Sequence, residues 1–141
     1  MKRREFIKDI AVGSLLLQIK PPLLAQSASP DLAVIKGESP AQITKAAVAA
    51  LGGMKKFVSK GDNIVIKPNI GWDRRPEQGA CTNPEVVRTL IELCFDAGAK
   101  KVKVLDNPCN PARRTYVRSG IAQAAKEAGA EVPFPNEHKL K

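Results

Sequence analysis

The stretch from Asn83 to Asp106, NPEVVRTLIELCFDAGAKKVKVLD, decides the fold because it holds one complete helix and one complete strand. Asn83 is a good N-cap, and Pro84 suits the first helical position. Apolar residues then recur at helical spacing until Gly98, where a glycine is typical of a helix end. The segment 102–105, VKVL, follows and has two valines and a leucine, as expected of a strand. The stretch therefore predicts a helix–strand unit that places Asp106 at the carboxyl end of the strand.

The same alternation extends to both sides of this unit. The predicted elements are, in order, a strand at 32–35, a helix that Ser39 caps and Gly52 closes, a strand at 64–66, the helix and strand above, a long loop at 107–119, a helix that Gly129 closes and a fourth strand from Glu131. Strand–helix alternation is typical of an α/β fold, a parallel sheet with right-handed βαβ crossovers. Only a short charged tail follows the fourth strand, so we expect the sheet to be incomplete, an amino-terminal part of a larger domain.

Charge gives a broad indication of the partner. The formal net charge is +9, and the basic residues outside the first 29 positions are spread along the chain. Such a balance suits an anionic ligand or a negatively charged surface, and a solvated basic face is the alternative. Aromatic residues make up 4% of the chain and no nucleic-acid-binding motif is present, so the composition disfavours nucleic acid as a partner.

The first 29 residues have the pattern of an export signal. Arg3 and Arg4 are followed by Phe6, an aliphatic residue and Lys8, which resembles the twin-arginine consensus. The apolar run 10–19 has the length of a signal-peptide core and is too short for a transmembrane helix. We expect a signal and linker at 1–29, an α/β domain at 30–141, recognition by the twin-arginine translocation machinery and a periplasmic or other extracytoplasmic location. A basic tail ahead of a cytoplasmic domain is the alternative.

Polar residues gather where the predicted strands end. In open α/β sheets, ligands bind beyond the carboxyl ends of the strands. Lys67 and Asn69 follow the strand at 64–66, Thr82 and Asn83 open the next helix, and Asp106 follows the strand after it. Lys67 and the amides of the helix start are candidates to hold an anion, and Asp106 is a candidate to bind a metal or a proton donor.

Each of these residues also has a structural explanation. Lys67 can be a solvated strand end, and Asn69 can close a turn after a proline. Thr82 and Asn83 can act only as helix caps, and Asp106 can belong to an ordinary turn. For each residue, both the ligand-binding and the structural explanation stay open.

The three cysteines occupy different environments. Cys94 lies at helical spacing with apolar residues and is expected in the core. Cys81 and Cys109 fall in loops at one sheet edge. Two alternatives are a disulfide between them and a bond from Cys109 to a soft metal. No CxxC pair is present, so this chain has no self-contained zinc or iron–sulfur motif. No GxGxxG follows a strand and no GxSxG occurs, so no reaction is assigned.

Three blocks of sequence resemble one known family. IVIKPNIGW (64–72), TNPEVVRTLIELCFDAGAKKVKVLDN (82–107) and YVRSGI (116–121) are similar, in order and spacing, to the domain of unknown function 362 family. The positions that carry the shared pattern are Lys67, Pro68, Asn69, Thr82, Pro84, Asp106, Ser119 and Gly120. The resemblance implies a longer protein and, because some members carry ferredoxin-type modules, redox work with an iron–sulfur cluster or another transition metal supplied by segments absent here.

Two functions follow as expectations. The first is a periplasmic redox or metal-binding protein with its site at the carboxyl edge of the sheet. The second is a non-catalytic module that captures an anionic small molecule through Lys67 and the helix that Asn83 caps.

Overall fold

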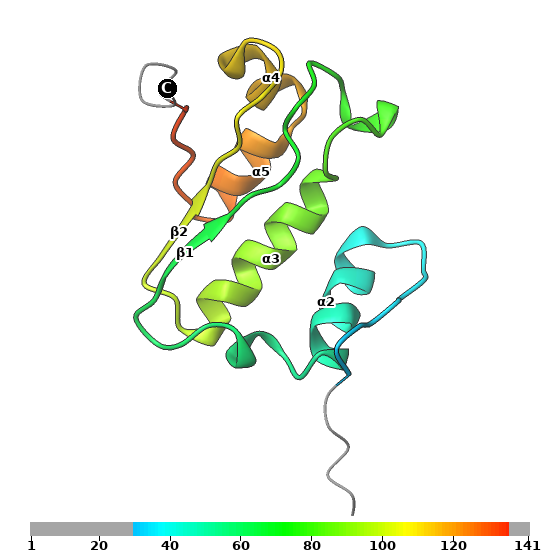
Figure 1. Ribbon diagram of the computed structural model, residues 1–141, viewed down its shortest axis with the longest axis vertical. Coiled ribbons are helices and arrows are strands. Elements are labelled where there is room, and N and C mark those ends of the chain that lie inside the picture. The colour runs from blue at the N-terminus through cyan, green and yellow to red at the C-terminus, as the bar shows by residue number, and fades with distance from the viewer. Residues whose placement is uncertain (1–29, 136–141) are drawn as a thin grey trace, which may run out of the picture.

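A computed structural model describes residues 30–135 of the chain (Figure 1). Its elements are the helix α2 (Pro40–Ala50), the 3-10 turn η1 (Met54–Lys56), the strand β1 (Asn63–Ile66), the 3-10 turn η2 (Pro76–Gln78), the helix α3 (Pro84–Ala97), the strand β2 (Lys101–Val104) and the helices α4 (Ala112–Arg118) and α5 (Ile121–Glu127). None of the helices within this range has the length and hydrophobicity that a membrane crossing requires. The leader residues Arg3 and Arg4 lie outside the described range.

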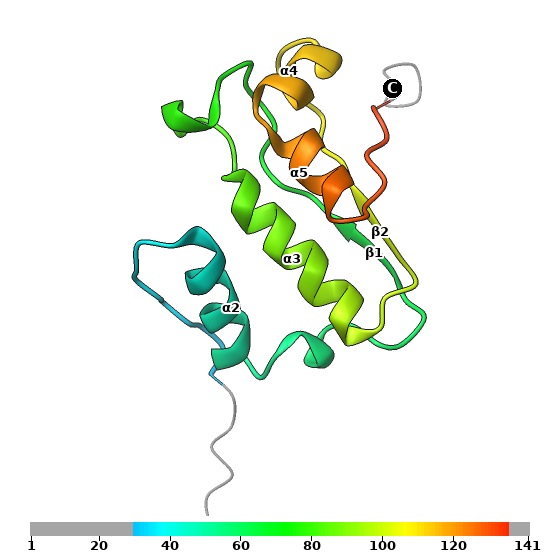
Figure 2. The same cartoon turned by 180° about the vertical axis from the view of Figure 1, so that it is seen from behind.

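The two strands pair in parallel, with Asn63 opposite Lys101 and Ile66 opposite Val104. This confirms the predicted α/β class and the parallel sheet. The strands are connected through α3, as a parallel pair requires a crossover. Figure 1 shows the sheet in front of α3 and α5, and Figure 2 shows the same helices in front of the sheet, so both helices cover one face.

The strand predicted at 32–35 is wrong. This segment has no ladder partner among the described residues, and Leu32 and Val34 are 77% and 85% exposed. An apolar run such as LAVI forms a strand only where a neighbouring strand takes its backbone hydrogen bonds, so strand propensity alone did not decide the element. The predicted fourth strand is reduced to a single parallel bridge between Lys103 and Glu131. Pro133 and Pro135, which have no N–H to donate, follow that bridge.

Helix α2 begins at Ser39 as predicted and is only partly buried. The Ser39 hydroxyl accepts a hydrogen bond from the amide of Gln42 at 3.3 Å, and Pro40 takes the first position. Ile43 and Ala47 are half-buried, while no residue of the helix is fully buried. The helix packs against α3 at the side of the molecule, away from the sheet (Figure 2).

Helix α3 is the centre of the fold. Val87, Ile91 and Cys94 are buried and face the strand residues Val102 and Val104 in one core. The burial of Cys94 confirms its predicted place, and that burial raises the pKa of its thiol. The helix ends at Gly98, whose φ of 107° favours glycine and whose Cβ position would lie 3.2 Å from the backbone of Lys60.

The long loop predicted at 107–119 contains a helix, α4, that sequence periodicity did not reveal. Its sequence ARRTYVR has no apolar stripe. The helix buries only Thr115 and Tyr116, so its contact with the core needs no repeating apolar positions. Gly120, with φ 73°, separates α4 from α5, and this positive φ allows the sharp change of direction between the two helices. The helix α5 begins at Ile121 and buries that residue with Ala122 and Ala125.

Candidate functional site

The carboxyl ends of β1 and β2 meet at one edge of the sheet, as parallel pairing requires. Lys67 directly follows β1, and Asp106 lies two residues beyond the end of β2. Their side chains form an ion pair, with 2.6 Å between Lys67 Nζ and Asp106 Oδ1. The structure therefore brings these two candidate residues into direct contact, while their role as ligand residues stays a prediction.

Asp106 is buried and both of its carboxylate oxygens have partners. Oδ1 pairs with Lys67, and Oδ2 accepts a hydrogen bond from the amide of Ile70 at 2.7 Å. Burial alone would raise the pKa of this carboxyl, but the hydrogen bonds from Lys67 and two backbone amides, with the charge of Lys67, hold the pKa below its ordinary value. Asp106 is thus an ionised group that joins the end of β2 to the loop after β1.

Tyr116 of α4 supports Asp106 from the other side. The phenol donates a hydrogen bond to the Asp106 carbonyl oxygen and accepts one from the Asp106 amide, both at 2.7 Å. Its side chain is fully buried, and this burial is the main cause that raises the pKa of Tyr116. Sequence reasoning missed this residue. The available signal was that it is the only tyrosine of the chain and opens the family-like block YVRSGI.

Asn69 and Thr82 tie the loop that follows β1 to the start of α3. The Thr82 hydroxyl accepts from the amide of Asn69 at 2.9 Å, and Asn69 Oδ1 accepts from the amide of Gly71 at 2.9 Å. Asn69 Nδ2 donates to the carbonyl oxygen of Ala80 at 3.2 Å. These bonds are those of a closed loop, which matches the structural explanation of both residues.

The start of α3 is capped from within the protein. Asn83 Oδ1 accepts from the amide of Glu85 at 2.8 Å, and the Asn83 carbonyl oxygen accepts from the amides of Val86 and Val87. Pro84 has no amide hydrogen. The amides that were expected to hold an anion therefore already have partners, and Asn83 is placed as a cap.

A second buried carboxylate, Asp73, lies in the loop after β1. Arg114 Nε is 2.6 Å and Arg118 Nη1 is 3.7 Å from Asp73 Oδ2, and Arg74 Nη1 donates to the Asp73 carbonyl oxygen at 2.9 Å. The Asp73 amide donates to Asn110 Oδ1 at 3.0 Å. We call Asp73 with these three arginines the arginine cluster. Sequence reasoning noted Arg114 and Arg118 only as basic loop residues, because nothing local links them to position 73.

One carboxylate oxygen of Asp73 has no hydrogen-bond partner in the part of the chain that the structure describes. Oδ1 is buried and accepts no hydrogen bond from any residue within 30–135. An unsatisfied buried acceptor costs about 1–3 kcal/mol, and such a group in a folded protein calls for an explanation. The orphan oxygen distinguishes the arginine cluster from an ordinary surface ion pair.

Cys81 and Cys109 lie on either side of the same loop. The Cys81 thiol donates to the carbonyl oxygen of Trp72 at 3.2 Å, and the Cys109 amide donates to the carbonyl oxygen of Gly71 at 2.9 Å. Both cysteines are free thiols. Within the described part of the chain, no three His, Cys, Asp or Glu side chains lie together as metal ligands would.

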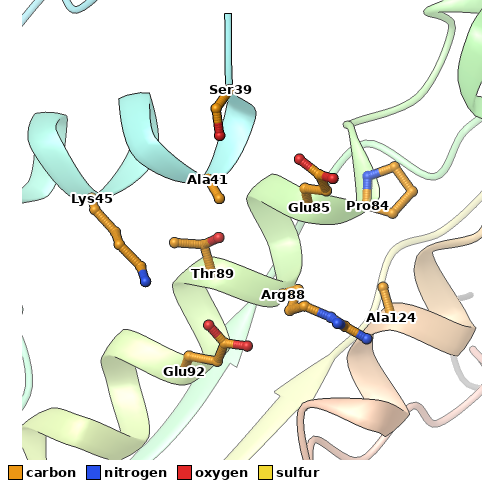
Figure 3. A pocket seen from close by; sticks show the side chains of 9 residues that line it. All are labelled: Ser39, Ala41, Lys45, Pro84, Glu85, Arg88, Thr89, Glu92 and Ala124. Carbon is orange, nitrogen blue, oxygen red and sulfur yellow. The ribbon is translucent and has the colours of Figure 1, made fainter.

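A pocket of about 350 Å³ opens between α2 and α3 (Figure 3). Lys45 points from α2 toward α3, while Arg88 points toward α5, where it pairs with Glu127. The charged groups in its lining are two basic and two acidic: Lys45, Arg88, Glu85 and Glu92. Because these charges balance, the pocket attracts an anion less strongly than the carboxyl edge of the sheet, where positive charge is in excess.

Comparison with known proteins gives a family and one curated relative. The Thylakoid-associated protein sll1697 of Synechocystis sp. is 44% identical over 50 residues, which are 36% of this chain and 16% of that relative. The chain therefore matches less than a fifth of the relative's length. No solved structure matches the chain. The family model described as Domain of unknown function (DUF362) matches residues 64–140, which include the whole carboxyl edge of the sheet and the arginine cluster. The chain belongs to this family.

Proposed function

We propose that the protein is a non-catalytic module that binds an anionic small molecule at the carboxyl edge of its sheet. The observation that carries the proposal is the charge of this edge. Four cationic side chains, those of Lys67, Arg74, Arg114 and Arg118, contact two buried aspartates. An excess of positive charge is left, and this attracts an anion.

The two aspartates hold the cationic side chains in position for a ligand. Each carboxylate is 7% exposed, whereas the side chains of Lys67 and Arg114 are 69% and 66% exposed. A buried anion that holds the inner end of a cation fixes its position, so less conformational entropy is lost when a ligand binds. The cations remain open to solvent on their outer side.

Calorimetric titration of the full chain with small anions at low ionic strength tests this function. We expect wild type to bind at least one of phosphate, sulfate and citrate, and Lys67→Gln to weaken that binding several-fold. Lys126→Gln, which removes an equal charge from the far end of α5, is the matched control and should leave binding unchanged. Wild-type protein that binds none of the three anions would contradict the proposal.

A redox or metal function is the second candidate. Its supporting observation is that Cys81 and Cys109 bond to the adjacent residues Trp72 and Gly71, which brings two free thiols to one loop. The described residues supply no complete ligand set, so we assign no metal-dependent step. Metal analysis of protein purified after export tests the candidate: a stoichiometric transition metal supports it, and metal-free protein that binds anions supports the first proposal instead.

Export by the twin-arginine route to a periplasmic or other extracytoplasmic location is also part of the proposal. Its support is the pattern of Arg3, Arg4, Phe6 and Lys8. The name of the cyanobacterial relative places that protein at the thylakoid. Lysine cannot imitate the planar guanidinium fork, so the double variant Arg3→Lys, Arg4→Lys should not be translocated. Unchanged accumulation of this variant outside the cytoplasm would contradict the route.

A further inference from the structure

We infer that the arginine cluster is a phosphate site, in which Arg114 and Arg118 hold the anion and Asp73 Oδ1 accepts the proton of its P–OH group. This inference rests on the proposed function and deepens it, because it names the chemical class of the ligand and the residues that select it.

Arg114 and Arg118 are arranged as a clamp. They are one turn apart on α4, so their side chains leave the same side of the helix. Asp73 Oδ2 contacts Nε of Arg114, which leaves the two terminal amino groups of this guanidinium for another partner. A guanidinium presents donors in a planar fork that matches the oxygens of a phosphate.

The charge of the cluster matches that of phosphate. Three arginines and one aspartate leave two positive charges. A phosphate group carries about −1.5 to −2 at pH 7. The guanidiniums come from two segments, since Arg74 approaches Asp73 from the loop and the other two from α4. This arrangement suits a tetrahedral anion, whose oxygens point in several directions, better than a planar carboxylate.

The orphan oxygen supplies the selectivity. Asp73 Oδ1 is an acceptor without a donor within 30–135, and hydrogen phosphate carries one P–OH donor. Sulfate at neutral pH has similar size and charge but no proton to donate. The side chains of Arg114 and Arg118 are 66% and 47% exposed, so the guanidinium groups that contact this carboxylate can be reached from solvent. A site with an acceptor for a ligand proton rejects the analogue that lacks it.

The test compares inorganic phosphate with sulfate on the full chain, by calorimetry at pH 7.5 and constant low ionic strength. We expect phosphate to bind at least about tenfold more tightly than sulfate, because sulfate leaves the buried acceptor unpaired. The double variant Arg114→Gln, Arg118→Gln should weaken phosphate binding by more than about tenfold, since each arginine supplies charge-assisted hydrogen bonds. The double variant Arg113→Gln, Lys126→Gln also removes two positive charges, from a residue stacked on Phe134 and from the end of α5, so it is the matched control and should change little.

Asp73→Asn provides a separate readout, because an amide can donate to sulfate and the preference for phosphate should shrink. If this variant does not fold, the exposed arginine pair still tests the site, and circular dichroism checks its fold. Equal binding of phosphate and sulfate by wild type overturns the inference and leaves the proposed function standing. Anion binding that is weakened by Lys67→Gln but not by the arginine variant also overturns the inference and leaves the proposed function standing. Wild type that binds no anion overturns both.

Discussion

Asp106 holds two loops together through its charge. Its carboxylate takes Lys67 on one oxygen and the Ile70 amide on the other, and its backbone is bonded twice to Tyr116. We expect Asp106→Asn to lower the free energy of unfolding by about 1–3 kcal/mol at pH 7, because it removes the charge from a buried hydrogen-bonded group. Denaturant unfolding measures the loss, and Asp96→Asn, an exposed carboxylate on α3, is the control.

The effect of Asp106→Asn should depend on pH in one direction. The pKa of Asp106 is lowered in the folded protein, so its charge stabilises the fold fully above the unfolded value of about 3.9. That contribution is lost as the pH falls through the lowered folded pKa. The difference between wild type and variant should therefore be largest near neutrality and shrink below about pH 4. A difference that stays constant from pH 7 to pH 3 would show that the charge is not what stabilises the fold.

Residues were predictable where sheet topology alone brings them together. Lys67 and Asp106 could be placed side by side because both follow parallel strands. The contact between Asp73 and Arg114 could not, since it depends on how two irregular loops pack and leaves no periodic signal. The same is true of Tyr116, whose hydrogen bonds reach ten residues back to the backbone of Asp106.

Elements were predictable where a cap and an apolar period coincide. Helix α3 has both, and its start at Pro84 and its end before Gly98 are as predicted. Helix α4 has neither a side-chain cap nor an apolar stripe, and it exists because Thr115 and Tyr116 are buried by tertiary packing. The segment 32–35 shows the opposite case, in which strand propensity is present and the partner strand is absent from the described region.

The cap of α3 separates the two explanations of Asn83. Because Asn83 Oδ1 accepts from the Glu85 amide, Asn83→Ala should cost about 0.5–2 kcal/mol of stability. Asn83→Asp should keep the stability, since aspartate is an equally good cap and favours the positive end of the helix dipole. Thermal unfolding of both variants measures this. If Asn83 instead held an anion, Asn83→Asp would repel that anion and weaken its binding several-fold while stability stayed intact.

At the scale of the whole molecule, the described residues 30–135 cover the sheet on one side only. Helices α3 and α5 bury Val102 and Val104, whereas Val65 on the other face is 59% exposed (Figures 1 and 2). A hollow of about 450 Å³ on this open face is lined by Val65 together with Lys100, Lys101 and Lys103. Parallel sheets are usually covered on both faces, so an exposed valine at this position is unusual. Lys101 is paired with Glu131, and Lys100 and Lys103 give the open face a positive rim.

This combination predicts self-association that increases with salt. At low ionic strength the lysine rims of two copies repel each other, and the screening length falls from about 10 Å at 0.1 M to about 3 Å at 1 M. Apolar contact between the open faces is then less opposed, so the sedimentation coefficient of the full chain should rise with salt. Val65→Lys should abolish this rise and change the free energy of unfolding by less than about 1 kcal/mol, because the side chain is exposed. Val117→Lys, at a valine of α4 that is 71% exposed, is the control and should associate like wild type. Association that is lost equally in both variants would place the contact elsewhere than on the open face of the sheet.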